Sequence, residues 1–236
     1  MTPSAFRLGL SGAIPEPEVL RENKTNSADI HQTVRRLVER ALARGDRIVY
    51  GSHPSFTPII EDVALRFLRP DLNRRVRMFV ARRFFNPAEW DDYFARHARY
   101  ASIEPIGGFE TPRDEALEEL RERMVSEFDA MVCIGGKLHW EGTDKPGVLE
   151  EFEKAVARQP PIPIYLLGGS GGCTRMLFEN RGPNPIPNGL DEPDNNQLGK
   201  SALVWEAIEL LFKGLAQIRP RPRSPDDREP GTAEVV

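Results

Sequence analysis

Glycine and hydroxyl residues gather at four points of the chain, each directly after a short apolar segment. Glycine lets backbone amides approach an anion without a Cβ in the way, and a helix that follows adds its positive N-terminal end. If the four turns converge, they predict a cradle for a phosphate or pyrophosphate. The residues are Ser11 and Gly12, then Gly51, Ser52 and His53, then Gly135, Gly136 and Lys137, and finally Gly168, Gly169, Ser170, Gly171 and Gly172.

The sequence lacks both of the standard phosphate-binding fingerprints. The GGSGG segment at 168–172 is not a GxGxxG, and no GxxxxGK[ST] occurs anywhere, so a P-loop NTPase is excluded. A single glycine at the end of a strand is more often a simple turn former. Four such turns at one sheet edge favour a nucleotide-like ligand.

Two amphipathic segments each carry a charged residue close to their apolar stripe. At 100° per residue, Glu151 lies near the stripe border, whereas Glu150 is expected to face water. Arg121 flanks the stripe of the preceding helix and is a candidate phosphate ligand. Two alternatives stay open: Glu150 and Glu151 can simply complement the helix dipole, and Arg121 can pair locally with Glu118, Glu119 or Glu122.

The histidine and serine positions disfavour a zinc site and a hydrolase triad. The other histidines, His31, His97 and His139, have no ligand spacing, so no metal is predicted, and His53 is expected to contact a ligand or its own loop. No GxSxG surrounds any serine. Trp140 can stack on a base or pack on its own loop.

These residues have to be positioned by strands and helices, and the two alternate along the chain. Helix-length crossovers between short apolar strands predict a doubly wound, mainly parallel sheet in a three-layer α/β/α arrangement. A loop is expected at 182–200. Strands are expected at 6–10, 47–50, 76–80, 103–106, 130–134 and 163–167, and helices from Ser27 as N-cap to Gly45, then at 57–68, 87–99, from Thr111 to about 128, at 148–158 and at 202–218.

Composition bounds the class of protein. The 236 residues are 39% hydrophobic and carry a net charge of -4, which disfavours a nucleic-acid partner, and no run is long enough to span a membrane. We expect one domain at 1–218 and a disordered, proline-rich and charged tail at 219–236. Cys133 and Cys173 lack a CxxC spacing, and the N-terminus has no signal pattern, which predicts a reduced, cytoplasmic protein.

The order of these residues resembles the SLOG superfamily. This Rossmann-like group includes the lonely-guy phosphoribohydrolases, the DNA-processing protein A family, the N-terminal region of TRPM channels and sensor domains of bacterial defence systems. The hydrolases carry an Arg-containing helix, an apolar strand and a PGGxGTxxE stretch. Here Arg121, the segment 130–134, Gly135-Gly136 and the run from Pro146-Gly147 to Glu151 follow in that order, and the resemblance spans about 6–215.

The resemblance implies a Rossmann-like nucleotide-binding fold and leaves two functions open. The segment 137–146 separates Gly136 from Gly147, so the compact hydrolase loop is interrupted, and the chain looks more like the sensors of NAD-derived or ADP-ribose-like nucleotides. Glu151 would hold the ribose and Arg121 or Lys137 the phosphate, with no cofactor required. A homo-oligomer and a defence effector partner are also implied. In the alternative, Glu151 and Arg121 are catalytic residues of an N-glycosidase.

Overall fold

The computed structural model describes residues 5–67, 75–139, 145–181 and 187–218. The expected tail at 219–236 and Trp140 lie outside these ranges, so neither expectation is tested.

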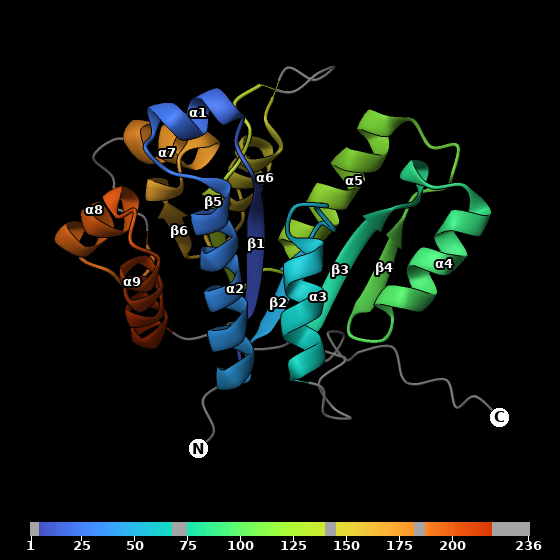
Figure 1. Ribbon diagram of the computed structural model, residues 1–236, viewed down its shortest axis with the longest axis horizontal. Coiled ribbons are helices and arrows are strands. Elements are labelled where there is room, and N and C mark those ends of the chain that lie inside the picture. The colour runs from blue at the N-terminus through green and yellow to red at the C-terminus, as the bar shows by residue number, and fades with distance from the viewer. Residues whose placement is uncertain (1–4, 68–74, 140–144, 182–186, 219–236) are drawn as a thin grey trace.

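The described residues form a six-stranded sheet with the order β4-β3-β2-β1-β5-β6, and every paired strand is parallel (Figure 1). The expected doubly wound α/β fold is therefore confirmed. Each strand lies where the apolar segments predicted it, and β1 extends three residues beyond the prediction. The strands are β1 (Arg7–Ala13), β2 (Arg47–Tyr50), β3 (Val76–Ala81), β4 (Ser102–Ile106), β5 (Ala130–Gly135) and β6 (Ile164–Leu167).

The extension of β1 depends on the small residue Gly12. A Cβ there would lie 2.2 Å from the carbonyl oxygen of Ile134, so only glycine lets the ends of β1 and β5 pair as closely as they do. The chain order also reverses at this pair, because β2 to β4 extend the sheet on one side of β1 and β5 and β6 on the other. Ligands of doubly wound folds bind outside the carboxyl ends of the strands at such a switch point.

Helices of the described residues connect the strands and cover both faces of the sheet. They are α1 (Pro17–Glu22), α2 (Ser27–Arg44), α3 (Thr57–Arg66), α4 (Pro87–His97), α5 (Arg113–Ser126), α6 (Gly147–Val156), α7 (Gly172–Asn180), α8 (Glu192–Lys200) and α9 (Val204–Gln217), together with short 3₁₀ turns at Arg82–Phe84 and Gly168–Ser170.

Some sequence predictions about these helices are wrong. The region 182–200 was expected to be a loop, yet α8 lies within it, because the Asp191 side chain accepts a hydrogen bond from the Asp194 amide and caps a new helix. Neither α1 nor α7 was predicted. The cap of α2 is Asn26 rather than Ser27, since the Asn26 side chain accepts from the Asp29 amide.

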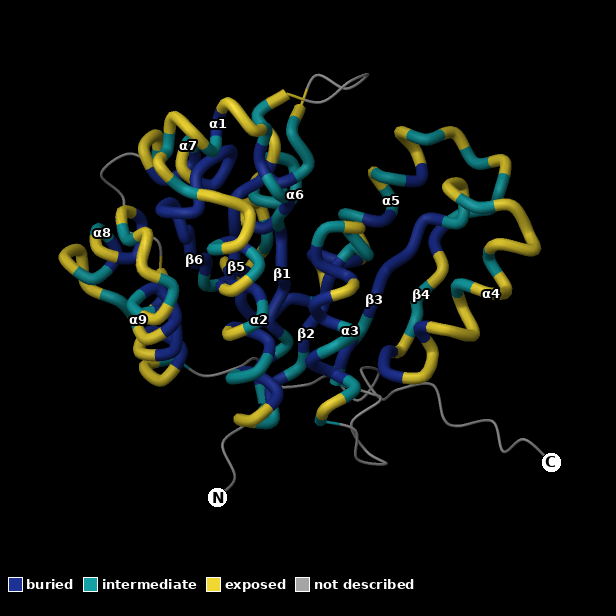
Figure 2. Tube along the Cα trace, viewed as in Figure 1, coloured by how far each residue is buried: buried dark blue, intermediate teal, exposed yellow. Residues whose placement is uncertain are grey.

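Side chains alternate along the strands between two apolar layers. Ile48 and Tyr50 pack into the layer built with α2, α3 and α9, whereas Val49 packs into the layer built with α5, α6 and α7. In Figure 2 the inner strands β1, β2 and β5 are mostly buried, whereas the edge strand β4 has exposed residues, and many other exposed residues lie on the helices. Strands buried on both faces explain the continuous apolar runs in the sequence.

Candidate functional site

A cavity of about 810 Å³ lies at the carboxyl ends of β1, β2 and β3, with α5 and α6 forming another wall. This volume is within the range of small-molecule sites in proteins. The structure brings eight of the residues predicted from sequence together around it: Gly12, Gly51, Ser52, His53, Arg121, Lys137, Gly147 and Glu151.

The glycine turn after β6 does not line this cavity, because it packs against backbone. A Cβ on Gly168 would lie 2.4 Å from the carbonyl oxygen of Gly199, and a Cβ on Gly169 would lie 1.7 Å from that of Ser201. Ser170 Oγ accepts from the Gly135 amide at 2.6 Å and donates to the Leu167 carbonyl at 2.5 Å. This turn therefore joins β6 to β5.

The Gly135-Gly136 turn after β5 packs against the start of α7. The Cys173 amide donates to the Gly136 carbonyl at 3.0 Å, and a Cβ on Gly172 would lie 2.1 Å from that same oxygen. Gly135, Gly136, Gly171 and Gly172 all have positive φ values between 60° and 91°. The structure gives these glycines a role in close backbone contact and places none of them among the residues that line the large cavity.

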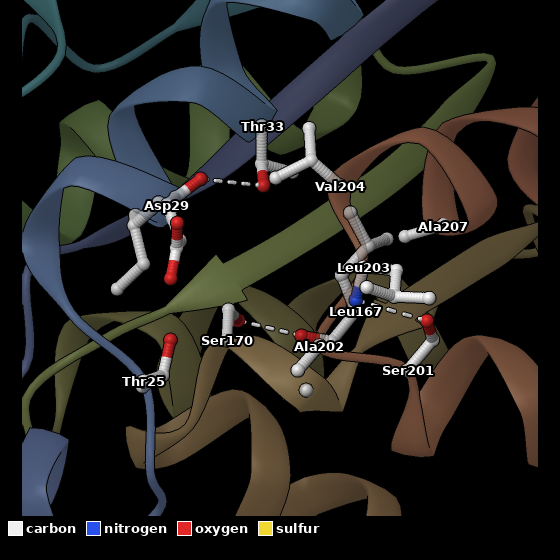
Figure 3. Close-up of a pocket in the computed structure, with 12 residues that line it drawn as sticks. Thr25, Asp29, Thr33, Leu167, Ser170, Ser201, Ala202, Leu203, Val204 and Ala207 are labelled. Atoms are coloured by element: carbon white, nitrogen blue, oxygen red, sulfur yellow. Dashed lines mark hydrogen bonds between the residues drawn. The ribbon is translucent and has the colours of Figure 1, made fainter.

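Gly169 and Ser170 instead line a second, much smaller pocket (Figure 3). Its volume is about 20 Å³, which is enough for about one water molecule. Figure 3 shows Thr25, Asp29 and Thr33 on one side of it and Leu203 on the other. A nucleotide does not fit in this space.

Arg121 of α5 contacts the first turn of α6. Its guanidinium forms an ion pair with Glu150 and packs against Gly147, where an added Cβ would lie 3.1 Å from an Arg121 nitrogen. The expectation that Glu150 faces water is therefore wrong, because the ion pair draws the Glu150 side chain inward to 18% exposure. The local alternative is also not used, as Glu118 and Glu119 pair with Lys154 and Arg123.

Glu151 is the titratable group of the cavity whose pKa lies closest to neutrality. Burial raises the pKa of its carboxyl to about 7, although the Ser11 hydroxyl and the Arg121 charge lower it and Glu150 raises it further. Ser11 Oγ is itself buried and has no hydrogen bond of ordinary geometry. Glu151 can therefore exist in both protonation states near pH 7.

The turn after β2 presents a strained backbone and a neutral histidine to the cavity. Ser52 has a φ of 53°, a left-handed conformation that few non-glycine residues adopt and that is found often at ligand sites. His53 Nδ1 accepts from the Ser55 amide at 3.2 Å, which assigns the ring proton to Nε2. Burial and the charge of Lys137 lower the pKa of His53 to about 4, so it is a hydrogen-bond donor without charge at pH 7.

Two helices begin at the cavity without a side-chain cap. The first residues of α3, Thr57 and Pro58, and those of α6, Gly147 and Val148, line the cavity, and neither helix has a capping hydrogen bond from a side chain. The positive end of a helix dipole and its amide groups attract anions. Together with Lys137 and Arg121 they make this region suitable for phosphate.

Several cavity residues were not identified from the sequence. Arg113 lies on the same face of α5 as Leu117 and Arg121, a relation that spacings of four residues could have shown. Phe84, Phe85 and Tyr93 follow β3, whose end has no glycine and so gave no signal. Their position after a strand end was the only available indication.

Other chemistries find little support among the described residues. The described residues contain no group of three His, Cys, Asp or Glu side chains able to hold a metal ion. None of the helices within the described ranges has the length and apolar character needed to cross a membrane. Cys133 and Cys173 are both free and buried, and burial raises the pKa of each thiol, which disfavours a nucleophilic role.

A comparison with protein-family models identifies the family. The family model described as the SLOG cluster3 family matches residues 21–198, which include the turn after β2, Arg121, Lys137 and Glu151. No curated protein matches the chain.

Proposed function

We propose, from the premise that this chain belongs to the SLOG cluster3 family, that the large cavity binds a nucleotide-derived ligand of the NAD or ADP-ribose type. The observation that carries the proposal is the meeting of anion-binding groups with one ionisable carboxyl in a single cavity. Lys137, Arg121 and the start of α6 are the anion-binding groups, and Glu151 is the ionisable carboxyl.

The proposed contacts follow from the chemistry of each group. A carboxylate accepts two hydrogen bonds, so Glu151 suits the paired hydroxyls of a ribose. The backbone of Gly51 to His53, Lys137 and the first turn of α6 suit the phosphates. The glycines after β5 and β6 were expected to hold phosphate from their sequence, but their backbone contacts favour a structural role.

Binding of ADP-ribose, NAD and AMP to the full chain tests the proposal. We expect at least one to raise the melting temperature and to bind with a Kd that calorimetry measures, because a ligand that binds the native state stabilises it. Arg121→Ala should weaken binding about tenfold or more, since it removes a charged contact. Arg123→Ala is the matched control, as Arg123 lies on the same helix in an exposed pair.

A result against the proposal is equally definite. If none of the three nucleotides binds, or if Arg123→Ala weakens binding as much as Arg121→Ala does, the large cavity is not the nucleotide site.

A second function, hydrolysis of an N-glycosidic bond, is favoured by the pKa of Glu151 near 7. In this reaction water adds to the anomeric carbon and the bond to the base nitrogen breaks. The proton from water ends on the base when the substrate is AMP, and it is released to solvent when the substrate is NAD, because nicotinamide leaves as a neutral molecule. Glu151 is suited to hold the ribose or transfer that proton. Chromatography of AMP or NAD incubated with the protein would detect free base, and Glu151→Gln should abolish its release while binding persists. A sensor would bind without releasing base.

The proposed sensor role further includes self-association and an effector partner in bacterial defence. What supports it is family membership together with two exposed apolar side chains near the start of α9, Leu203 and Trp205, which are 54% and 64% exposed. Exposed apolar side chains of this size are a feature of association surfaces.

A further inference from the structure

The cavity has an aromatic end that the proposed ribose and phosphate contacts leave unused. Phe84 and Phe85 follow β3, and Tyr93 projects from α4, and all three line the cavity. We call these three residues the aromatic wall. Phe84 is 53% exposed, although nearby apolar side chains of β3 are buried. A large apolar side chain left open toward a cavity indicates that something apolar covers it when the site is filled.

Ring contacts behind it hold the aromatic wall in place. The Phe85 ring lies 4.6 Å from the ring of Tyr93 and 5.8 Å from that of Trp90, and Trp90 and Tyr93 are stacked at 6.3 Å. Tyr93 also contacts His97, with ring centroids 4.1 Å apart. Packed rings cannot turn freely, so Phe85 and Tyr93 offer a preorganised surface at little entropic cost.

The charge at this end suits a neutral ring better than a phosphate. Glu61 and Arg96 line it and are joined by two hydrogen bonds of 2.8 and 3.2 Å, so their charges offset each other. Of the groups in the cavity that attract anions, Arg121 and the start of α6 lie on the side of Glu151.

The separation of the two ends matches the two parts of a nucleotide. Glu151 lies beside Ser11 of β1, and the aromatic wall follows β3. Neighbouring strands are spaced by about 4.8 Å, so two strand spacings separate the ends by about 10 Å. A ligand with a base attached to its sugar can bridge that span, whereas a sugar phosphate alone cannot.

We propose that the aromatic wall binds the nucleobase of the ligand, with the ring stacked on Phe84 and supported by Phe85 and Tyr93. This inference rests on the proposed nucleotide-binding function and adds the location and chemistry of the base subsite. Stacking on a π surface tolerates different bases, so the wall selects for the presence of a base.

Calorimetric titration of AMP, ADP-ribose and ribose 5-phosphate into the full chain tests this inference. Phe84→Ala should weaken the binding of AMP and ADP-ribose about fivefold or more and leave the affinity for ribose 5-phosphate unchanged, because only AMP and ADP-ribose carry a base. Phe84 is exposed, so its removal spares the core. Phe94→Ala is the matched control, since Phe94 is 41% exposed on α4 and lies outside the cavity lining.

Fluorescence gives a second readout in the same titrations. Trp90 contacts Phe85 and Tyr93, so AMP should change its emission while ribose 5-phosphate should not, and Trp90→Phe should remove the change.

The outcomes separate this inference from the proposed function. If AMP binding depends on Arg121 but Phe84→Ala binds AMP as the wild type does, the base lies elsewhere and the inference is overturned, while the proposed function stands. If Phe84→Ala weakens AMP but Arg121→Ala does not, the base subsite stands and the proposed phosphate contacts fail. If no nucleotide binds, both are overturned.

Discussion

Two neighbouring glutamates show how strongly single residues depend on their surroundings. Glu150 and Glu151 occupy adjacent positions near the start of α6, with Glu150 in its first turn, and dipole complementation was an alternative for both. Glu150 is bound by the Arg121 guanidinium, whereas Glu151 is partly buried beside Ser11, where its pKa rises to about 7. The chemistry of these two adjacent residues therefore differs.

The raised pKa of Glu151 predicts a pH dependence of stability. The folded carboxyl binds its proton more tightly than the unfolded one, whose pKa is 4.5, so ionisation costs the wild type stability as pH rises from about 4.5 to 7. Glu151→Gln avoids this cost. The variant should therefore gain stability relative to the wild type between pH 5 and pH 8, by at most about 3 kcal/mol.

Urea unfolding at pH 5, 6, 7 and 8 measures this difference. Other titrating groups are common to both proteins and cancel in the comparison. A stability difference that stays constant over this pH range would show that the Glu151 pKa is not raised.

At the scale of elements, the glycine turns divide into two kinds. Gly12, near the end of β1, and the turn after β2 line the large cavity, whereas the glycines after β5 and β6 contact each other through Ser170 and the start of α7. In sequence the four turns look alike. The difference arises because α7 and the segment before α9 pack against the latter pair and fill the space beside them.

Ser170→Ala distinguishes a structural turn from a ligand site. The change leaves the buried Gly135 amide without its acceptor, which should cost about 1–3 kcal/mol of stability. Nucleotide affinity should stay within about twofold of the wild type, since Ser170 lies outside the large cavity. Ser102→Ala, at the exposed start of β4, is the control and should change neither quantity.

Denaturant midpoints measure the change in stability, and calorimetry measures the change in nucleotide affinity. A loss of nucleotide binding with unchanged stability would place the ligand at the β6 turn, as its glycine pattern had suggested, and would contradict the structural role.

At the scale of the whole molecule, the β1–β5 pair joins the two halves of the sheet. Asp129, just before β5, accepts hydrogen bonds from the Arg7 amide at 2.9 Å and from its guanidinium at 3.0 and 3.2 Å, and its side chain is only 4% exposed. Asp46, before β2, accepts from the Phe6 amide at 3.0 Å. The start of β1 is thus hydrogen-bonded to residues that directly precede both neighbouring strands, β5 and β2.

Asp129→Ala should destabilise the entire domain. Removing the carboxylate leaves the half-buried Arg7 guanidinium without that partner at the join of the sheet, which should cost about 3 kcal/mol and lower the melting temperature in one transition. Asp91→Ala on the exposed face of α4 is the control and should have little effect. Calorimetry that shows two transitions would instead indicate that the sheet halves unfold independently.

Local patterns along the chain were enough to predict the fold class. Apolar runs identified all six strands, and Gly45 ended α2 in a left-handed conformation as expected. These features depend on contacts between residues close in sequence and on burial of both sheet faces, which composition and periodicity record. The helix α8 was missed because its start depends on one aspartate cap within a segment rich in loop-forming residues.

Which residues line the cavity, in contrast, was decided by packing between segments distant in the sequence. No local pattern distinguishes Gly51, which lines the cavity, from Gly169, which abuts Ser201. Helical periodicity favoured Glu151 over Glu150, but it did not indicate the ion pair of Glu150 with Arg121. The aromatic residues after β3 joined the cavity only because that strand lies two places from the switch point. Local forces specify which elements form, but the surroundings of a side chain depend on which elements pack against it, and that is a property of the assembled fold.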